Sequence, residues 1–457
     1  MPATDSMPLK KTECYIILIV AFLGWLFAGV QMGINGIVHH PAARSLLGPE
    51  ASGGAVGQWS GWLVVAFLLG AATGGYCFGW VGDRFGRARA MALSIGCYAL
   101  FSALTVLAPR IEVMWLLRYL TCVGIGGMWP NGMALLQEAW PNTAKPILAG
   151  ILGTSANVGI MLFALLCMQI EVSPEHWQWT FWVGSVPIIL AVIAWYLVPE
   201  SPKWLAEQKQ PGQVVEPVGL GEVFSGGHIK LTLIGIVLAF VPLFGGWGVA
   251  NWANYWAADY DERQATVSPE VQNLGKPDLE TNPDSDQASS SATVVTASNL
   301  KAIASFNRSW PGAISSLLGG ALALVLGRRF SYALLCILAF ICTQFLYALP
   351  DPTAPDFLFW VRGLGFFSGF FFGWLPLCLP ELFPTRVRST GSGVSFNFGR
   401  IIVAGLVIFT SLALKSYFEG NYDQVGKICG YIYLLGVVAV FAMPKDCATD
   451  NSQLLVK

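Results

Sequence analysis

Charged side chains are scarce in this sequence: Asp, Glu, Lys and Arg make up 12% of its 457 residues, whereas hydrophobic residues make up 54%. Soluble globular domains carry about 25% charged residues. The low value excludes an ordinary soluble domain and indicates a chain that lies largely within a membrane. The formal net charge of −1 gives no indication of nucleic acid, so we expect small molecules and the lipid bilayer as partners.

The sequence also lacks the residue spacings of a metal site, a disulfide framework or a catalytic centre. Its ten cysteines lie in apolar runs or at their ends, and none belongs to a Cys-x-x-Cys pair. It contains no nucleophile–base pair and no phosphate-binding loop that we can recognise. We therefore expect neither an enzyme nor a bound metal or cofactor. If the chain couples transport to an ion, the proton is the ion that we consider.

Apolar runs of membrane-spanning length recur along the chain. A helix needs about 20 predominantly apolar residues to cross the hydrocarbon layer of a bilayer. Runs of this kind lie at 13–36, 58–80, 90–108, 113–136, 147–169, 178–198, 231–256, 308–327, 330–349, 357–379, 394–415 and 425–443. They predict an all-α membrane protein with twelve transmembrane helices.

The runs fall into two groups of six. We assign 1–202 to a first half, 203–229 to a cytoplasmic linker and 230–457 to a second half. Between the first two runs of the second half, residues 259–305 predict a long extracytoplasmic loop, part of it rich in serine. Loops of this length are either functional or linkers, and we favour a linker.

Short matches in the same order relate the two groups of runs. GVQMGIN (29–35) corresponds to GVANWAN (248–254), and DRFGR (83–87) to RRFSY (328–332). Later in each half, QEAWPNTAK (137–145) corresponds to PELFPTRVR (380–388), and SANVG (155–159) to SFNFG (395–399). The repetition predicts two pseudo-symmetric six-helix bundles.

Lysine and arginine are unevenly divided between the two sides of the predicted bundle. They are more frequent in the segments that share a side with the N-terminus, such as those around Lys10, Lys11, Arg84 and Arg87. Positively charged loops stay on the cytoplasmic side. The sequence therefore predicts an integral protein of the inner or plasma membrane with both termini in the cytoplasm, and we expect a monomer.

Several stretches resemble signature motifs of the major facilitator superfamily of secondary transporters. A Gly-Asp-Arg turn followed by Gly-Arg lies at 82–87. PESPKWL (199–205) and PELFPTRVRSTGSG (380–393) resemble signatures of its sugar-porter and organic-ion branches, and MWPNGMALLQEAWPNTAK (128–145) is similar to sialate-type carboxylate symporters. The resemblance implies the major facilitator fold, in which two halves rock around a central site and give alternating access.

The same resemblance implies that the charged turns act as cytoplasmic latches. The arginines of the first turn can pair with carboxylates such as Glu138 or Glu200. Plain positive-inside charge would explain the arginines, but it would not explain Asp83 and the two glycines. The predicted gating residues are Gly82, Asp83, Arg84, Gly86, Arg87, Glu138, Glu200, Glu381, Arg386 and Arg388.

Arginine is the charged residue found within the apolar runs, and no acid lies in the middle of a run. The four candidates are Arg118, Arg308, Arg362 and Arg400. Intramembrane cations without acids favour an anionic substrate, because a guanidinium matches a carboxylate with two hydrogen bonds. For Arg118 and Arg362, which the repeat relates, we favour a structural role; Arg400 has no repeat partner, and we favour substrate binding.

Amide side chains within the runs are the other candidates for substrate contact, since they both donate and accept hydrogen bonds. Bonding between helices is the alternative role for each of them. The predicted substrate-binding residues are Gln31, Asn35, Asn131, Asn157, Asn251, Asn254, Asn397 and Arg400. Gln31 and Asn35 cannot titrate, so proton coupling through Glu138, His39 or His40, facilitated diffusion and exchange all stay open.

The sequence thus predicts a secondary transporter of a small polar organic solute. We favour an organic anion or an acidic sugar, with a neutral sugar as the alternative. Sugar porters carry a glutamine pair where this chain has Gly245 and Gly246, so the standard hexose site is not expected. A transporter-like receptor or sensor is a third interpretation, with 259–305 as its partner site.

Overall fold

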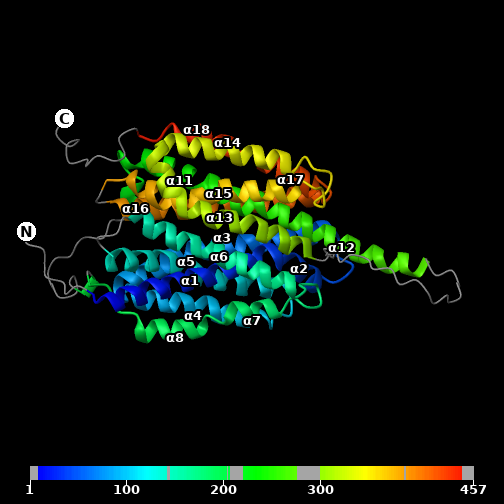
Figure 1. Ribbon diagram of the computed structural model, residues 1–457, viewed down its shortest axis with the longest axis horizontal. Helices are drawn as coiled ribbons and strands as arrows, with labels where there is room; N and C mark the ends of the chain where they lie inside the picture. The colour runs from blue at the N-terminus through cyan, green and yellow to red at the C-terminus, as the bar shows by residue number, and fades with distance from the viewer. Residues whose placement is uncertain are drawn as a thin grey trace, which may run out of the picture.

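The computed structural model describes residues 9–140, 145–202, 204–205, 220–274, 299–384 and 387–444. In these residues every regular element is a helix, and the long helices run side by side in one bundle (Figure 1). Twelve helical segments are long and apolar enough to cross a membrane. The prediction of an all-α protein with twelve spans is therefore confirmed.

The first half contains six spans, and its last span is broken. Pro187 lies at the break, where its missing N–H group interrupts the helical hydrogen bonds and separates two short helices within the span Trp179–Leu197. The helices are α1 (Lys11–Ile37), α2 (His39–Leu47), α3 (Gly53–Phe85), α4 (Arg87–Thr105), α5 (Ile111–Ala139), α6 (Lys145–Gln169), α7 (Trp179–Ser185) and α8 (Ile188–Leu197).

The second half repeats this order with one irregular span. A π-helical turn of sequence GGWGV joins two α-helices into the span His228–Gln264, and such turns are frequent at functional sites. The elements are α10 (Leu220–Val223), α11 (His228–Phe244), η1 (Gly245–Val249), α12 (Ala250–Leu274), α13 (Leu300–Leu326), α14 (Arg328–Leu346), α15 (Phe357–Glu381), α16 (Arg388–Ser416), α17 (Tyr422–Cys429) and α18 (Ile432–Val440).

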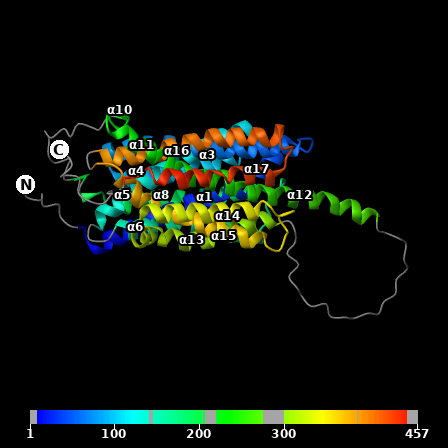
Figure 2. The ribbon, with the colours of Figure 1, turned by 90° about the horizontal axis from the view of Figure 1, so that it is seen from above.

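The predicted loop 259–305 is wrong at both ends. Helix α12 continues to Leu274 and projects beyond the bundle (Figure 2), and α13 begins at Leu300. The prediction ended the helix where charged residues begin, but Asp259 and Asp261 are buried among other helices, so the helix continues through them. The middle of the predicted loop, 275–298, lies outside the described residues. The predicted linker 203–229 contains α10, and 206–219 likewise lies outside them.

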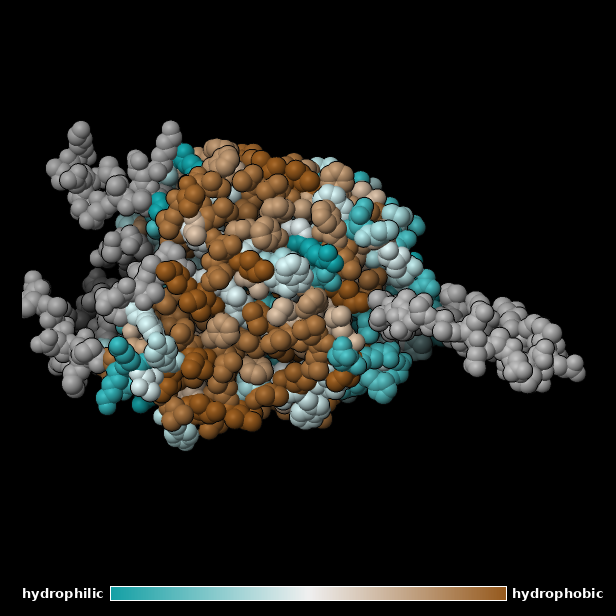
Figure 3. Space-filling model, in the orientation of Figure 1, coloured by the Kyte–Doolittle hydropathy of each residue, from teal (hydrophilic) through white to brown (hydrophobic). Residues whose placement is uncertain are grey.

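Different elements lie at the two ends of the bundle (Figure 1). The first residues of α1 and the turn from α3 to α4 lie at one end, which we call the proximal end. Helices α2 and α17 and the projecting part of α12 lie at the other, which we call the distal end. Between the ends, hydrophobic side chains cover most of the visible side wall (Figure 3), as contact with lipid tails requires.

The two halves touch mainly along two helix pairs, α3 with α16 and α6 with α13. Small residues bring these backbones together. A Cβ atom on Gly61 would lie 2.8 Å from the Cβ of Ser411, and one on Gly150 would lie 2.9 Å from the backbone oxygen of Leu317. Close approach through small residues is the usual way in which helices pack within membranes.

Candidate functional site

Arg118 on α5 is fully buried and bonds to amides of α1. Its guanidinium donates to Oε1 of Gln31 at 2.7 Å and to Oδ1 of Asn35 at 3.2 Å. Gln31 in turn donates through Nε2 to the backbone oxygen of Gly184 at 2.9 Å. All these groups belong to the first half, so most of the hydrogen-bonding capacity of Gln31 is used in joining helices of that half.

Asn35 also takes part in a second cluster, which joins α1 to α12. The hydroxyl of Tyr255 donates to the backbone oxygen of Asn35 at 3.1 Å. A Cβ atom on Gly36 would lie 2.5 Å from Nδ2 of Asn254 and 3.8 Å from Oδ1 of Asn251. Glycine at position 36 therefore lets these two asparagines of the second half approach α1 of the first.

Three amide atoms of this cluster lack hydrogen-bond partners within the described part of the chain. They are Nδ2 of Asn35, Oδ1 of Asn251 and Nδ2 of Asn254. A buried polar group without a partner costs about 1–3 kcal/mol, and native interiors rarely contain several together. Among the predicted substrate-binding residues, Asn35, Asn251 and Asn254 thus lie close together, and each has a side-chain atom that is free to form a hydrogen bond.

Arg400 lies on α16 where it faces the first half. Its guanidinium donates to the backbone oxygen of Ala71 on α3 at 3.2 Å and to Oδ1 of Asn397 at 3.3 Å. It also lies 4.6 Å from the ring centroid of Phe396. No ion pair joins Arg400 to a carboxylate in the described residues, although the residue is only 8% exposed. An anion would compensate this buried charge.

The remaining predicted contacts bond to backbone oxygens elsewhere. Asn131 donates to the backbone oxygens of Phe78 and Gly127, both in the first half, at 3.0 and 2.8 Å. Asn157 on α6 donates across the halves to the backbone oxygen of Gly312 on α13 at 3.4 Å. These contacts fit the alternative role of bonding between helices.

At the proximal end, Glu200 caps α4. One carboxylate oxygen of Glu200 accepts from the backbone N–H groups of Arg87 and Ala88 at 2.8 and 3.1 Å. Trp204 donates through its indole N–H to the backbone oxygen of Asp83 at 2.9 Å. Glu200 and Trp204 of the PESPKWL motif therefore order the turn through its backbone groups. Glu200 binds the start of a helix rather than the guanidinium that we expected.

The arginine–carboxylate pairs of this end follow the repeat. Arg87 lies 3.6 Å from Glu138, and Arg328 lies 2.8 Å from Glu381. Each arginine begins a helix directly after a glycine with positive φ. The structure thus relates 86–87 to 327–328, so our correspondence of DRFGR with RRFSY is out of register.

Other predicted gating residues can be placed only in part. Gly82 is buried against Asn131, since a Cβ atom there would lie 2.0 Å from its Oδ1. The guanidinium of Arg84 stacks on Trp80, 5.5 Å from the ring centroid. Arg386 lies outside the described residues, and Arg388 begins α16 but its side chain lies outside them.

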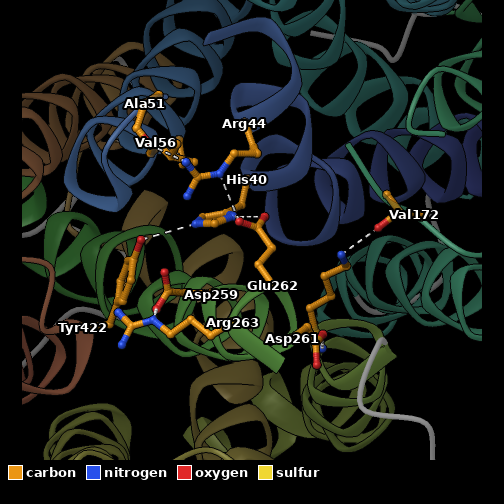
Figure 4. A network of polar contacts seen from close by, with 12 residues as sticks. His40, Arg44, Ala51, Val56, Val172, Asp259, Asp261, Glu262, Arg263 and Tyr422 are labelled. Carbon is orange, nitrogen blue, oxygen red and sulfur yellow. Dashed lines mark hydrogen bonds and ion pairs between the residues drawn. The ribbon is translucent and has the colours of Figure 1, made fainter. Parts of the chain in front are cut away.

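The distal end is closed by charged residues that join the two halves (Figure 4). Nδ1 of His40 lies 2.9 Å from one carboxylate oxygen of Glu262, and Nε of Arg44 lies 3.2 Å from the other. The hydroxyl of Tyr422 lies 3.4 Å from Nε2 of His40. Because α2 belongs to the first half and α12 and α17 to the second, these contacts must break if the halves separate here.

Further charged groups of α12 and α13 surround this closure (Figure 4). Arg263 pairs with Asp259 at 2.7 Å, and the ammonium of Lys301 donates to the backbone oxygen of Val172 at 2.7 Å. The backbone N–H of Lys301 donates to Asp261 at 3.4 Å. We expected these residues in a loop, although Asp259, Glu262 and Arg263 have the spacing of one helical face.

The sequence matches a known protein family over most of its length. The model of the Major Facilitator Superfamily matches residues 14–408. The chain belongs to the major facilitator superfamily. It is therefore an integral membrane protein of a transporter family, which binds small molecules, and not an enzyme.

Curated relatives of this transporter span most of its length. It is 26% identical to the cis,cis-muconate transport protein of Acinetobacter baylyi, over 73% of each chain. It is also 26% identical to a putative metabolite transport protein of Haemophilus influenzae, over 94% of this chain and 95% of the relative. The sialic acid transporter NanX of Escherichia coli is 22% identical, over 89% and 87% of the two chains.

A solved structure of the xylose transporter XylE from E. coli has the same fold. The partially occluded inward-open conformation superposes with a TM-score of 0.69 and covers 96% of this chain and 100% of the other, at 17% sequence identity. The likeness confirms the predicted major facilitator fold. At this identity it concerns the fold alone.

Proposed function

We propose that this transporter carries a small organic anion across the membrane by alternating access. The observation that carries the proposal is Arg400, a buried guanidinium at the contact between the halves with no carboxylate partner in the described residues. A substrate carboxylate would supply the missing charge and would reach the guanidinium from between the halves.

The relatives support an acid rather than a neutral sugar. Those with named substrates include transporters of muconate, gallate and sialic acid, all of which are organic acids. The unpaired atoms Nδ2 of Asn35, Nδ2 of Asn254 and Oδ1 of Asn251 add two donors and an acceptor for the rest of such a molecule. A neutral sugar is the alternative outcome of the test below.

The proposed mechanism is a rocking motion of the halves 1–202 and 230–457. With both termini in the cytoplasm of a monomer, the distal end faces outward, and its ion pairs form the outer closure. The pairs Arg87–Glu138 and Arg328–Glu381 order the turns on the cytoplasmic side. Uptake measured with and without a proton gradient, as described below, distinguishes proton coupling from exchange and facilitated diffusion.

The test is uptake into proteoliposomes that contain the purified protein. Labelled cis,cis-muconate, sialic acid and a neutral hexose are supplied with and without an inward proton gradient, and Arg400→Gln is compared with the parent. The control is Arg89→Gln, which removes an exposed charge of α4. Because a charge-assisted hydrogen bond contributes about 1.5–3 kcal/mol, we expect kcat/KM for the acid to fall about 10- to 100-fold in Arg400→Gln.

The outcomes distinguish the two substrate classes. Acid uptake that depends on Arg400 but not on Arg89 supports the proposal. Hexose uptake without acid uptake, unchanged by Arg400→Gln, would replace the anion by a neutral sugar.

A further inference from the structure

Arg308 occupies an unusual position on α13. It lies on the face of the helix that points into the bundle, where its neighbours one turn away, Ala304, Ser305, Pro311 and Gly312, are all buried. Arg308 itself is only half-buried. Its side chain therefore leaves α13 on the inward face of the helix rather than on the lipid side.

The guanidinium of Arg308 has no protein partner for its charge. No hydrogen bond and no ion pair joins its side chain to any residue that the structure describes. The three other intramembrane arginines all have hydrogen-bond acceptors: Arg118 in Gln31, Arg362 in Asn307 and Arg400 in Ala71. An unpaired charge inside a protein is costly, and the described residues do not compensate the charge of Arg308.

Three tyrosines lie within electrostatic range of this charge. Arg308 interacts electrostatically with Tyr255, Tyr347 and Tyr433. The hydroxyls of Tyr255 and Tyr347 already donate to the backbone oxygens of Asn35 and Val249. The hydroxyl of Tyr433 is buried and has no partner in the described residues, so an unpaired hydroxyl and an unpaired guanidinium lie in one region.

Glycines let the helices around these groups approach one another closely. Tyr433 lies over the π-helical turn η1, because a Cβ atom on Gly245 would come within 2.2 Å of its hydroxyl oxygen. Helix α15 holds α13 in place, since a Cβ atom on Gly365 would lie 2.1 Å from the backbone oxygen of Arg308. Tyr255 connects the region to the backbone of Asn35, and so to the cluster in which Nδ2 of Asn35, Oδ1 of Asn251 and Nδ2 of Asn254 are unpaired.

We propose that Arg308 binds the carboxylate of the transported anion, with the hydroxyl of Tyr433 as a further donor. The unpaired asparagine amides then bind hydroxyl, oxo or amide groups on the rest of the molecule. The substrate class is therefore a small carboxylic acid that carries additional polar groups. This inference rests on the proposed function and adds Arg308 to Arg400 as a second cation that recognises the charge of the substrate.

The test compares sialic acid with its methyl ester, which keeps every polar group except the charge. Equilibrium binding to the detergent-solubilised protein and uptake by proteoliposomes are measured for the parent, Arg308→Gln, Arg308→Lys and Tyr433→Phe. The control is Arg362→Gln, which removes a guanidinium of α15 that is bonded to Asn307 at 2.7 Å. Muconate is run in parallel as an acid of different shape.

We expect the parent to prefer the acid over the ester, and Arg308→Gln to lose that preference through an increase of about 10- to 100-fold in Kd for the acid alone. Arg308→Lys keeps the positive charge but cannot form the two parallel hydrogen bonds of a guanidinium. We therefore expect this variant to retain part of the preference for the acid over the ester. Tyr433→Phe should weaken acid binding a few-fold. If Arg308→Gln does not fold, the acid-to-ester ratios of the other two variants decide.

An unchanged acid-to-ester ratio in folded Arg308 variants, together with its loss in Arg400→Gln, would overturn this inference and leave the proposed function intact. A parent protein that binds and transports neither acid, but transports a hexose, would refute the proposed function itself.

Discussion

Gly86 shows how one residue organises the proximal turn. Its backbone has φ 105° and ψ 147°, a conformation that is open essentially to glycine alone. Gly327 takes nearly the same conformation, φ 80° and ψ 147°, at the equivalent place before α14. Both glycines end one long helix and start the next at once, so each positions the arginine that follows it beside a carboxylate of its own half.

Gly86→Ala should destabilise the first half. The backbone strain costs about 1–3 kcal/mol, and the added Cβ would lie 2.2 Å from Oε2 of Glu200, which caps α4. We expect a lower melting temperature in detergent micelles. Gly79→Ala is the control, because a Cβ atom there meets nothing within 4 Å; equal melting temperatures of the two variants would contradict the role given to Gly86.

At the scale of elements, α12 carries charges of both signs through a span. The hydropathy pattern ends near Trp256, but the helix continues because Asp259, Glu262 and Arg263 find partners on their own helix and on α2. The predicted substrate contacts on the same span, Asn251 and Asn254, lie further towards the middle of the bundle. One helix therefore contributes both to the candidate site and to the distal closure.

Glu262→Gln should open the distal end. The substitution removes the negative charge that His40 and Arg44 share, and each charge-assisted hydrogen bond contributes about 1.5–3 kcal/mol. Spin labels on Ser45 of α2 and Gln424 of α17, in a background free of reactive cysteines, report the separation of the halves.

We expect the distance distribution between these labels to shift to longer values in Glu262→Gln. Glu50→Gln, which removes an exposed carboxylate near α2, should leave it unchanged. A distribution that is insensitive to Glu262 would exclude these ion pairs as the closure.

At the scale of the whole molecule, two structurally similar halves pack against each other through α3 with α16 and through α6 with α13. Glycines bring the helices of each pair close together, as at Gly61 against the side chain of Ser411 and at Gly150 against the backbone of Leu317. Such surfaces hold the halves together by close packing and a few hydrogen bonds, with the charged pairs concentrated at the distal end. This arrangement is what a rocking motion between two preformed bodies requires.

A chain cut between Gly212 and Gln213 should still transport when both pieces are expressed together, because each piece contains one complete half. A cut between Ala257 and Ala258 should abolish uptake, since both residues are fully buried within α12. Uptake is measured in cells that express both pieces together, and it is compared with uptake in cells that express the intact protein. Loss of uptake after both cuts, with both pieces present in the membrane, would contradict two independently folding halves.

The number, order and type of the helices could be read from the sequence because each span must satisfy its own backbone hydrogen bonds in lipid. That demand produces an apolar run of fixed length whatever the neighbours are. Gly86 and Arg87 of the first turn were also visible, as part of a signature motif, whereas the equivalent Gly327, which has positive φ like Gly86, was not singled out. The register of one repeat and the ends of 259–305 were misjudged, because both depend on contacts between helices.

The sequence by itself determined a twelve-span transporter with arginine and amide side chains inside its spans. Only the tertiary structure decided which of these side chains are already paired. Arg118 meets Gln31 across 87 positions of the sequence, whereas Arg308 meets no acceptor in the described residues. The physical reason is that a side chain's partners come from helices that are distant in sequence, and only the packing of those helices brings them together.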